Sequence, residues 1–330
     1  MSDADNARIG RWRSLDALAD LARRLPPGGA SDLDALDRWL DAQLARTTDR
    51  AFARLFPDHL DLPGVVEPDY LHRTVEADGL RLLGGIRFYG QDVARPFVEA
   101  IAWTPMDDDG GVGDDDARSA WSASTVERLR RIAAREWRAF SPTHLRLHRP
   151  ETGSRTPPPP PAGTTTDVSV HVADVRRMMP DTGEVALRPA GVDEAVSLVG
   201  ARFEALGRDD PALARNVTPA DAETLAECAA AGSLFAMRSG GATVGLIATL
   251  PGAIDWIEGE VVMEEVVSVA HAGRGHAAAA QRALAARYAR EGRARRLIGT
   301  IDGANVASRR SAERAGRPAV SRYLFVPLAR

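Results

Sequence analysis

The chain has 330 residues, of which 44% are hydrophobic and 27% are charged, and its formal net charge is −4 at pH 7. This length predicts two domains, because a single core of ordinary size serves fewer residues. The small net charge excludes the broad basic field that holds nucleic acid. All 42 basic residues are arginine, so the chain has no lysine side chain of its own to acylate.

The single cysteine, Cys228, cannot form an intramolecular disulfide, which is typical of a protein in a reducing cytosol. Its helical context predicts a small buried apolar residue rather than a nucleophile. No apolar run reaches the ~18 residues of a membrane span, and the charged residues within positions 3–11 are unlike a secretion signal. We therefore expect a cytoplasmic protein without membrane contact.

The first half predicts two amphipathic helices, three strands, a helix and a strand. The expected ranges are helices at about 15–25 and 33–44, strands at 70–77, 80–89 and 96–104, a helix at 126–137 and a strand at 143–148. Residues 151–167 follow and contain five consecutive prolines. A proline run favours an extended polyproline conformation, which predicts a semi-rigid spacer between two folded halves.

The second half predicts a mixed α/β pattern in the order β-α-α-β-β-β-α-β-α-β. The expected strands are about 185–189, 234–238, 243–250, 261–269, 297–301 and 323–328, and the expected helices are 192–206, 219–230, 277–291 and 305–315. Both halves share the order α-α-β-β-β-α-β. This common order suggests two related copies in tandem.

The segment Ala272-Gly273-Arg274-Gly275-His276-Ala277 joins a predicted strand to an alanine-rich helix. Glycines allow a tight turn and the close approach of a ligand, and a helix start presents N–H groups with a partial positive charge. Together they predict a site for a phosphate or pyrophosphate. A nucleotide P-loop would need a lysine, and a dinucleotide loop would need an acidic residue ~20 residues on, and neither pattern fits.

A second motif follows one helix and one strand later, where Asn305 is a good helix N-cap and Gly316 a good C-cap. The loop and this helix together resemble the GNAT superfamily of N-acetyltransferases, in which an [R/Q]-x-x-G-x-[G/A] loop precedes an N-x-x-[S/A] helix that ends in glycine. The matching residues are Gly275, Ala277, Asn305, Ser308 and Gly316. Ala272 departs from the pattern, since the family usually has arginine or glutamine there.

The resemblance implies an α/β fold with a mixed central sheet flanked by helices, and a catalytic domain over residues 168–330. It implies transfer of an acetyl group from acetyl-coenzyme A, as co-substrate, to a primary amine by direct attack, without a metal. The closing segment Arg317–Leu328 is short for the final hairpin of that family. We therefore expect Val168–Val172, or a partner subunit, to add a strand.

The resemblance also implies roles for individual residues. The backbone of Val267 and Val269, with Ser268 between them, would pair with the pantetheine arm, and the amide of Val267 would polarise the thioester carbonyl. Asn305 and Ser308 would line the far wall. The residues whose N–H groups would cradle the pyrophosphate are Gly273, Arg274, Gly275, His276 and Ala277, and Arg274 can compensate for the missing side chain at Ala272.

An alkyl amine with a pKa near ~10 must lose a proton before it attacks a thioester, so the reaction favours a general base. Glu264 and Glu265 lie on the strand before the loop, and alternation along a strand directs them to opposite faces. Glu265 shares its face with Val267 and is our first candidate. An ion pair with an arginine is the structural alternative for each carboxylate.

The general acid is less clearly marked. Many GNAT members carry a tyrosine seven residues after the asparagine, where this chain has Ala312. Tyr323 on the closing strand and Ser311 are the remaining candidates. We interpret His271 as a packing residue at the strand end, and His276 as facing the phosphates or solvent.

The first half, residues 1–150, is interpreted as a degenerate GNAT-like copy or an accessory domain. Its third strand is followed by residues 107–116, which include six aspartates where a pyrophosphate would sit, and their charge would repel an anion. This run also lacks the alternating ligands and distal glutamate of a calcium loop. The sequence therefore predicts one coenzyme A site, in the second half.

Two functions remain as hypotheses. The first is an N-acetyltransferase that acts on a small-molecule or peptide amine. The second, motivated by the missing helix tyrosine, is a non-catalytic acyl-CoA-binding regulatory module. We expect no nucleic-acid partner and no metal, and both a monomer and a homodimer are compatible with the sequence.

Overall fold

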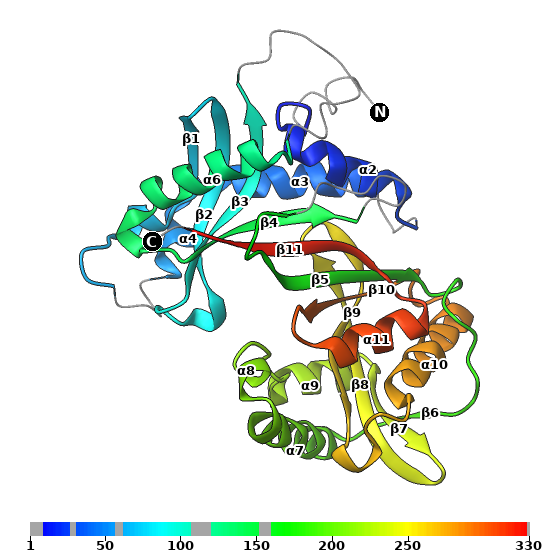
Figure 1. Ribbon diagram of the computed structural model, residues 1–330. Helices are drawn as coiled ribbons and strands as arrows, with labels where there is room; N and C mark the ends of the chain where they lie inside the picture. Colours follow the sequence, from blue (N-terminus) through cyan, green and yellow to red (C-terminus); the bar gives the residue numbers. More distant parts are fainter. Residues whose placement is uncertain (1–8, 27–30, 57–61, 107–119, 152–159, 329–330) are drawn as a thin grey trace. The chain divides into compact units, whose positions relative to one another are not determined.

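A computed structural model describes residues 9–26, 31–56, 62–106, 120–151 and 160–328. In this part of the chain no helix is both long and apolar enough to cross a membrane. The chain divides into two compact units (Figure 1). Unit 1 comprises Met1–Leu25, Asp32–Asp167 and Ser321–Arg330, and unit 2 comprises Pro26–Ser31 and Val168–Val320. The predicted acidic loop 107–116 and the prolines up to 159 lie outside the described residues.

Unit 1 is built on a mixed sheet with the strand order β1-β2-β3-β4-β11. Its strands are β1 (Arg73–Ala77), β2 (Leu80–Phe88), β3 (Pro96–Pro105), β4 (His144–Pro150) and β11 (Ala319–Pro327), and its helices are α2 (Asp16–Arg24), α3 (Asp32–Ala45), α4 (Arg50–Arg54) and α6 (Ala123–Glu136). Leu129 and Ile132 of α6 are fully buried against Leu82 and Leu145 of the sheet. The apolar stripe of α6 thus forms the core of this unit.

The strands of unit 2 include parallel and antiparallel neighbours and follow the order β5-β10-β9-β8-β7-β6. Its strands are β5 (Thr165–Asp174), β6 (Ala186–Pro189), β7 (Leu234–Ser239), β8 (Ala242–Ile254), β9 (Ile257–Val267) and β10 (Arg296–Asp302), and its helices are α7 (Val192–Asp209), α8 (Pro211–Ala214), α9 (Ala222–Ala230), α10 (His276–Glu291) and α11 (Val306–Ala315). Figure 1 shows α10 next to α11 and α7 next to α9.

The helices of unit 2 cover both faces of its sheet. Alanines and Leu284 of α10 pack with Ile247 and Val262 on one face. Val199 of α7 and the buried Cys228 of α9 pack with Leu246 and Val266 on the other face. Burial raises the pKa of the Cys228 thiol to about 11, which agrees with the predicted apolar role. Strand β9 therefore lies between two apolar layers.

The two units repeat one construction. In each, a helix links two neighbouring parallel strands, with α6 between β3 and β4 and α10 between β9 and β10. In each, an antiparallel strand pairs with the second strand of the parallel pair, β11 with β4 and β5 with β10. The predicted α/β fold, with mixed sheets flanked by helices in tandem halves, is confirmed by this shared topology.

Strands β5 and β11 each pair with the unit other than the one that precedes them in the chain. Residues Val168–Asp174 of β5 pair with β10 in unit 2, as expected for Val168–Val172. Residues Ser321–Pro327 of β11 pair with β4 in unit 1. The division thus differs from the predicted domain of residues 168–330 at its end, because the final strand completes the sheet of unit 1.

Several boundaries differ from those expected. β8 and β9 continue toward each other until a turn at Asp255, which has a φ of 54°, so Pro251 and Gly252 lie inside a strand and do not end it. β9 ends at Val267, and Val269 starts a short 3-10 turn. The short helices α4 and α8 have no counterpart in the predicted pattern, because four or five residues are too few to show a helical period.

Candidate active site

The glycine loop follows β9 and ends at the start of α10. Gly273 and Gly275 have φ angles of 77° and 83°, a region that favours glycine, and no heavy atom lies within 4 Å of a Cβ built on either. α10 begins at His276, and its N-cap Gly275 supplies no side-chain cap. Ala272, Gly273 and Arg274 are exposed. The helix start is therefore accessible from solvent, and unpaired N–H groups at such a start can bind an anion.

The parallel strands β9 and β10 part beside this loop. Register partners join Glu260 with Leu297 and Val261 with Ile298. β9 continues to Val267 and pairs there with β8 only, so its described residues from Val262 onward have no strand partner on the β10 side. The structure thus leaves a free strand edge that leads toward the loop at α10. A ligand that carries amide groups can pair with such an edge as an added strand.

The second motif lies at the end of β10. The side chain of Asn305 caps α11 by accepting a hydrogen bond from the N–H of Ser308 at 3.0 Å. Gly316 ends the helix with a φ of 86°, as the sequence predicts. Val306, at the helix start, and Val269, after β9, are large apolar residues with exposed side chains. Apolar groups exposed on both sides of the opening between β9 and β10 can contact a bound ligand.

Glu264 and Glu265 point to opposite faces of the sheet, as their positions in a strand predict. The Glu264 carboxylate accepts hydrogen bonds from the N–H of Ala220, before α9, and from the N–H of Glu265, each at 3.0 Å. It therefore faces the α7 and α9 layer, and burial raises its pKa. A register shift of β8 against β9 between Ala248 and Thr249 lies beside this pair.

Glu265 faces α10, where it accepts two hydrogen bonds from one amide. Gln281 Nε2 donates to its Oε1 at 3.0 Å and to its Oε2 at 2.8 Å. Burial raises the pKa of Glu265 to about 7, and the nearby Arg317 guanidinium opposes this shift. A carboxylate that titrates near neutral pH is suited to accept a proton from an amine.

Arg317 completes the same cluster. Its Nε donates to Gln281 Oε1 at 3.1 Å, its side chain is buried, and burial lowers its pKa to about 10. Its backbone oxygen accepts a hydrogen bond from the ring of His171 at 2.9 Å. Glu265, Gln281 and Arg317 are hereafter called the relay cluster. Gln281 and Arg317 were not singled out from the sequence, although two patterns point to them. Gln281 interrupts a buried alanine face, and Arg317 follows the C-cap glycine where an apolar contact is common.

The other acid–base candidates lie elsewhere. Ala312, at the position of the family tyrosine, is fully buried and cannot donate a proton. Tyr323 belongs to unit 1, where its ring stacks on His148 at a centroid distance of 4.2 Å and lies under the Arg146 guanidinium at 3.9 Å. The structure thus holds the Tyr323 side chain in the packing of unit 1, whereas the two glutamates belong to unit 2.

The histidines beside the loop have separate places. His271 Nδ1 lies 2.8 Å from Ser268 Oγ, so it fixes the turn after β9, in line with the packing role that we expected. His276 is the first residue of α10 and is partly exposed. Ser311 lies in α11 on the helix that Asn305 caps.

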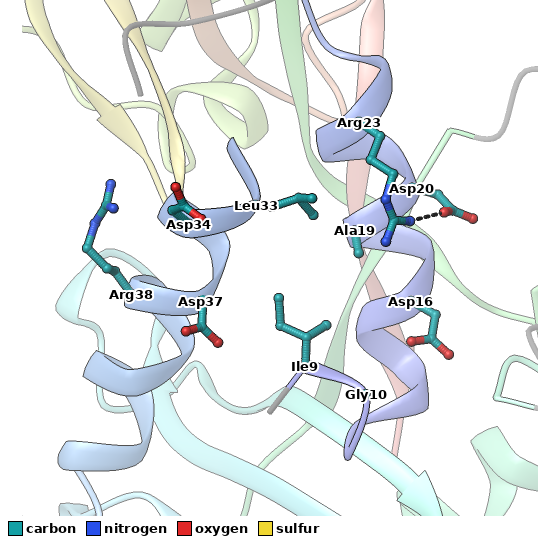
Figure 2. Close-up of a pocket in the computed structure, with 10 residues that line it drawn as sticks. All are labelled: Ile9, Gly10, Asp16, Ala19, Asp20, Arg23, Leu33, Asp34, Asp37 and Arg38. Atoms are coloured by element: carbon teal, nitrogen blue, oxygen red, sulfur yellow. Dashed lines mark hydrogen bonds and ion pairs between the residues drawn. The ribbon is translucent and has the colours of Figure 1, made fainter. Parts of the chain in front are cut away.

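A cavity of about 710 Å³ lies in unit 1, and none of its lining residues belongs to the predicted coenzyme site (Figure 2). Figure 2 shows that it opens between α2 and α3, with four aspartates and two arginines among its lining residues. Arg23 Nη1 and Asp20 Oδ1 form an ion pair at 2.6 Å on its wall. The lining residues are Ile9, Gly10, Asp16, Ala19, Asp20, Arg23, Leu33, Asp34, Asp37 and Arg38. This cavity offers carboxylates but no thiol, hydroxyl or imidazole nucleophile.

No family model and no curated protein matches the chain. Solved structures of similar fold include a GNAT-family acetyltransferase from Colwellia psychrerythraea, which is 10% identical, with 87% of this chain and 97% of that chain covered and a TM-score of 0.46. A tandem GNAT protein from the clavulanic acid biosynthesis pathway is 15% identical, with 100% and 98% covered and a TM-score of 0.40. A GCN5-related N-acetyltransferase from Sphaerobacter thermophilus is 14% identical, with 87% and 93% covered and a TM-score of 0.37.

The three are described as a GNAT-family acetyltransferase, a tandem GNAT protein and a GCN5-related N-acetyltransferase. At these identities and TM-scores the likeness carries no conclusion about activity.

Proposed function

We propose that unit 2 is an acetyl-CoA-dependent N-acetyltransferase that transfers an acetyl group to the primary amine of a small molecule or a peptide. One observation carries the proposal. The free edge of β9 leads to an uncapped helix start at α10, so an amide-bearing arm and an anionic group can be held in sequence by one continuous stretch of backbone. The pantetheine arm and pyrophosphate of coenzyme A have this order of groups.

The backbone supplies most of the expected coenzyme contacts. In the proposal, Val267 pairs with the pantetheine amides, and N–H groups from Gly273 to Ala277 bind the pyrophosphate. Ser268 and the exposed Val269 cover the arm from the side of β9. Asn305 and Ser308 line the opposite wall, at the start of α11. Because backbone N–H groups form the anion site, the alanine at position 272 does not remove it.

The transfer needs a base and a leaving group. In the proposal, Glu265 accepts the proton of the attacking amine, directly or through a water molecule, while the nitrogen lone pair forms a bond to the thioester carbonyl carbon. The carbonyl oxygen gains negative charge, which the N–H of Val267 stabilises. The tetrahedral intermediate then collapses, and the carbon–sulfur bond breaks to leave the amide and a thiolate.

The leaving thiolate does not require a dedicated acid. A thiol has a pKa of about 8–9, so its thiolate takes a proton from water or from the protonated base at neutral pH. This chemistry is compatible with an alanine at position 312 and with a Tyr323 side chain that packs within unit 1.

Titration calorimetry with coenzyme A and acetyl-CoA on the full chain tests the coenzyme site. We expect binding at micromolar concentration that is lost when Gly275 and Asn305 are both replaced. A panel of amines assayed by release of free thiol then tests transfer. Absence of coenzyme binding to the folded chain would refute the proposal.

A second candidate function is a non-catalytic acyl-CoA-binding regulatory module. The buried alanine at position 312 favours it, because the helix lacks the tyrosine that many family members use as an acid. This alternative predicts the same coenzyme affinity without thiol release for any amine of the panel. The two functions are therefore separated by turnover rather than by binding.

A further inference from the structure

The relay cluster joins three elements of unit 2 on the α10 face of its sheet. Glu265 comes from β9, Gln281 from α10, and Arg317 from the residue that follows Gly316 at the end of α11. The amide nitrogen of Gln281 donates hydrogen bonds to both carboxylate oxygens of Glu265. Its amide oxygen accepts a hydrogen bond from Arg317 Nε. The side chain of Gln281 is fully buried, so its orientation is fixed by these hydrogen bonds.

Arg317 is held in place by its backbone and by a glycine. Its N–H donates to Ala312 O at 2.8 Å as α11 ends, and His171 donates to its carbonyl oxygen at 2.9 Å. A Cβ added to Gly299 of β10 would lie 2.6 Å from Arg317 Nη1. The next nearest group to that Cβ outside Arg317 is Val262 of β9, at 3.5 Å. The guanidinium therefore lies at the level where β9 and β10 part.

Stability alone gives a poor account of this arginine. The residue is 2% exposed, and among the described residues its Nη1 atom has no hydrogen-bond partner. A buried guanidinium with a spare donor is costly, and an apolar side chain of similar size would fill the space at lower cost. Its position beside the carboxylate gives it an electrostatic effect that an apolar residue would lack.

We infer that Gln281 and Arg317 are positioning residues for the proposed general base, because they fix the direction of the Glu265 carboxylate and favour its charged form. This inference rests on the proposed function of Glu265. Gln281 donates to the two oxygens and so holds the carboxylate plane. Arg317 orients the Gln281 amide through its carbonyl oxygen and adds a positive charge. Neither residue touches the substrate in this arrangement.

Among the described residues, the charged groups that act on Glu265 come from two places. Arg317 and the Gln281 hydrogen bonds lower its pKa, whereas the neighbouring Glu264 raises it. Ile247 of β8, its register partner, is uncharged. Loss of Arg317 or Gln281 should therefore raise the pKa of Glu265 further, because burial would then act with less opposition.

The test measures Glu265 without requiring turnover. The full chain is labelled with ¹³C at the glutamate carboxyl, and the Glu265 signal is assigned by its loss in Glu265→Gln and titrated by NMR. Arg317→Met and Gln281→Leu should each move the midpoint upward by about one pH unit or more. Arg317→Lys keeps the positive charge, so the midpoint of Glu265 should move upward by less than in Arg317→Met. Gly299→Ala keeps Arg317 and displaces its guanidinium, and should give a smaller upward shift.

A matched control comes from the same strand. Glu260 of β9 and Arg293 form a buried ion pair at 3.0 Å outside the relay cluster. Arg293→Met should destabilise the chain without moving the midpoint of Glu265. If Arg317→Met and Gln281→Leu leave that midpoint unchanged while the chain stays folded, the inference is wrong.

Activity then separates the inference from the proposed function. If acetyl transfer is found, the acidic limb of its rate profile should move upward in Arg317→Met and Gln281→Leu by the same amount as the NMR midpoint, with KM for acetyl-CoA unchanged. If the midpoint moves but no amine is acetylated, the relay cluster stands and the proposed function fails. If acetyl transfer occurs and the acidic limb of the pH–rate profile is unchanged in both variants, the relay cluster has only a structural role.

Discussion

Glu265 donates its backbone N–H to the side chain of its neighbour Glu264 at 3.0 Å, so the two carboxylates of β9 are fixed to opposite faces at one point of the strand. The carboxylate oxygens of Glu264 accept hydrogen bonds from two backbone N–H groups. Glu265 receives its hydrogen bonds from a single side chain, Gln281. Removal of the Glu264 carboxylate would therefore disturb the backbone, whereas removal of the Glu265 carboxylate would disturb a side chain.

Replacement of Glu265 by glutamine should lower kcat for acetyl transfer by about 100-fold or more, because a positioned general base contributes at least that factor. In the unmodified chain, kcat/KM should rise with pH through about 7, since the pKa of Glu265 is raised to about 7 and only the ionised form accepts a proton. Initial rates of thiol release between pH 5.5 and 8.5 measure both effects.

Glu264→Gln is the matched control. Its carboxylate accepts from the N–H of Ala220 and the N–H of Glu265, so the substitution should lower the melting temperature. The pH profile should keep its midpoint but at a lower pH, because the charge of Glu264 raises the pKa of Glu265. A profile that loses its midpoint in Glu264→Gln and keeps it in Glu265→Gln would assign the base to Glu264 instead.

Local patterns predicted most of unit 2 because each element carries its own marker. Asn305 and Gly316 fixed both ends of α11, and the two loop glycines fixed the start of α10. The turn at Asp255 escaped prediction because proline and glycine at 251 and 252 usually end a strand, whereas here they continue β8. The pairings of β5 with β10 and of β11 with β4 join residues that are distant in the sequence. The spacing of hydrophobic residues along the chain does not show which strands will pair.

The candidate site divides in the same way. The glycine turn and the helix start at α10 could be predicted because both are local features of the sequence. The relay cluster could not, since Glu265, Gln281 and Arg317 are separated by 16 and 36 residues and meet only after the sheet forms. Tyr323 lies seven residues after Gly316 in the chain, yet its strand pairs with β4 of unit 1, a pairing that the local sequence does not mark.

Gly275→Ala should weaken binding of acetyl-CoA by about 5- to 10-fold. The φ of 83° at Gly275 costs an alanine about 1 kcal/mol, and relaxation of that strain would turn the first N–H groups of α10 away from a bound anion. Titration calorimetry measures the affinity. Gly232→Ala, at a φ of 67° after α9, should cause a similar loss of stability with no change in affinity. Equal affinities in both variants would argue against an anion site at this helix.

Asn305→Ala removes the cap of α11 and should lower the free energy of unfolding of unit 2 by about 1 kcal/mol. If Asn305 also lines the coenzyme site, the same variant should weaken binding of coenzyme A. Asp221→Ala removes the corresponding cap of α9, where Asp221 accepts from the N–H of Thr224 at 2.8 Å. The two variants should be alike in denaturation by urea and should differ in calorimetry with coenzyme A.

The contribution of His171 to the stability of unit 2 should be lost as the pH is lowered from about 6.5 to about 4, whereas the raised pKa of Glu265 acts in the opposite direction over this range. Burial lowers the pKa of His171 from 6.5 to about 4, so the folded state favours the neutral ring, whose Nδ1–H donates to Arg317 O. This contribution is complete above pH 6.5 and is lost as the pH falls toward 4, to an extent of at most about 3 kcal/mol. The difference in free energy of unfolding between the unmodified chain and His171→Gln should therefore shrink as the pH falls toward 4. Trp256 is the one tryptophan of unit 2, so the ¹⁹F signal of fluorotryptophan at this position follows its unfolding in urea at each pH. If that difference is the same at pH 6.5 and at pH 4, His171 does not make this contribution.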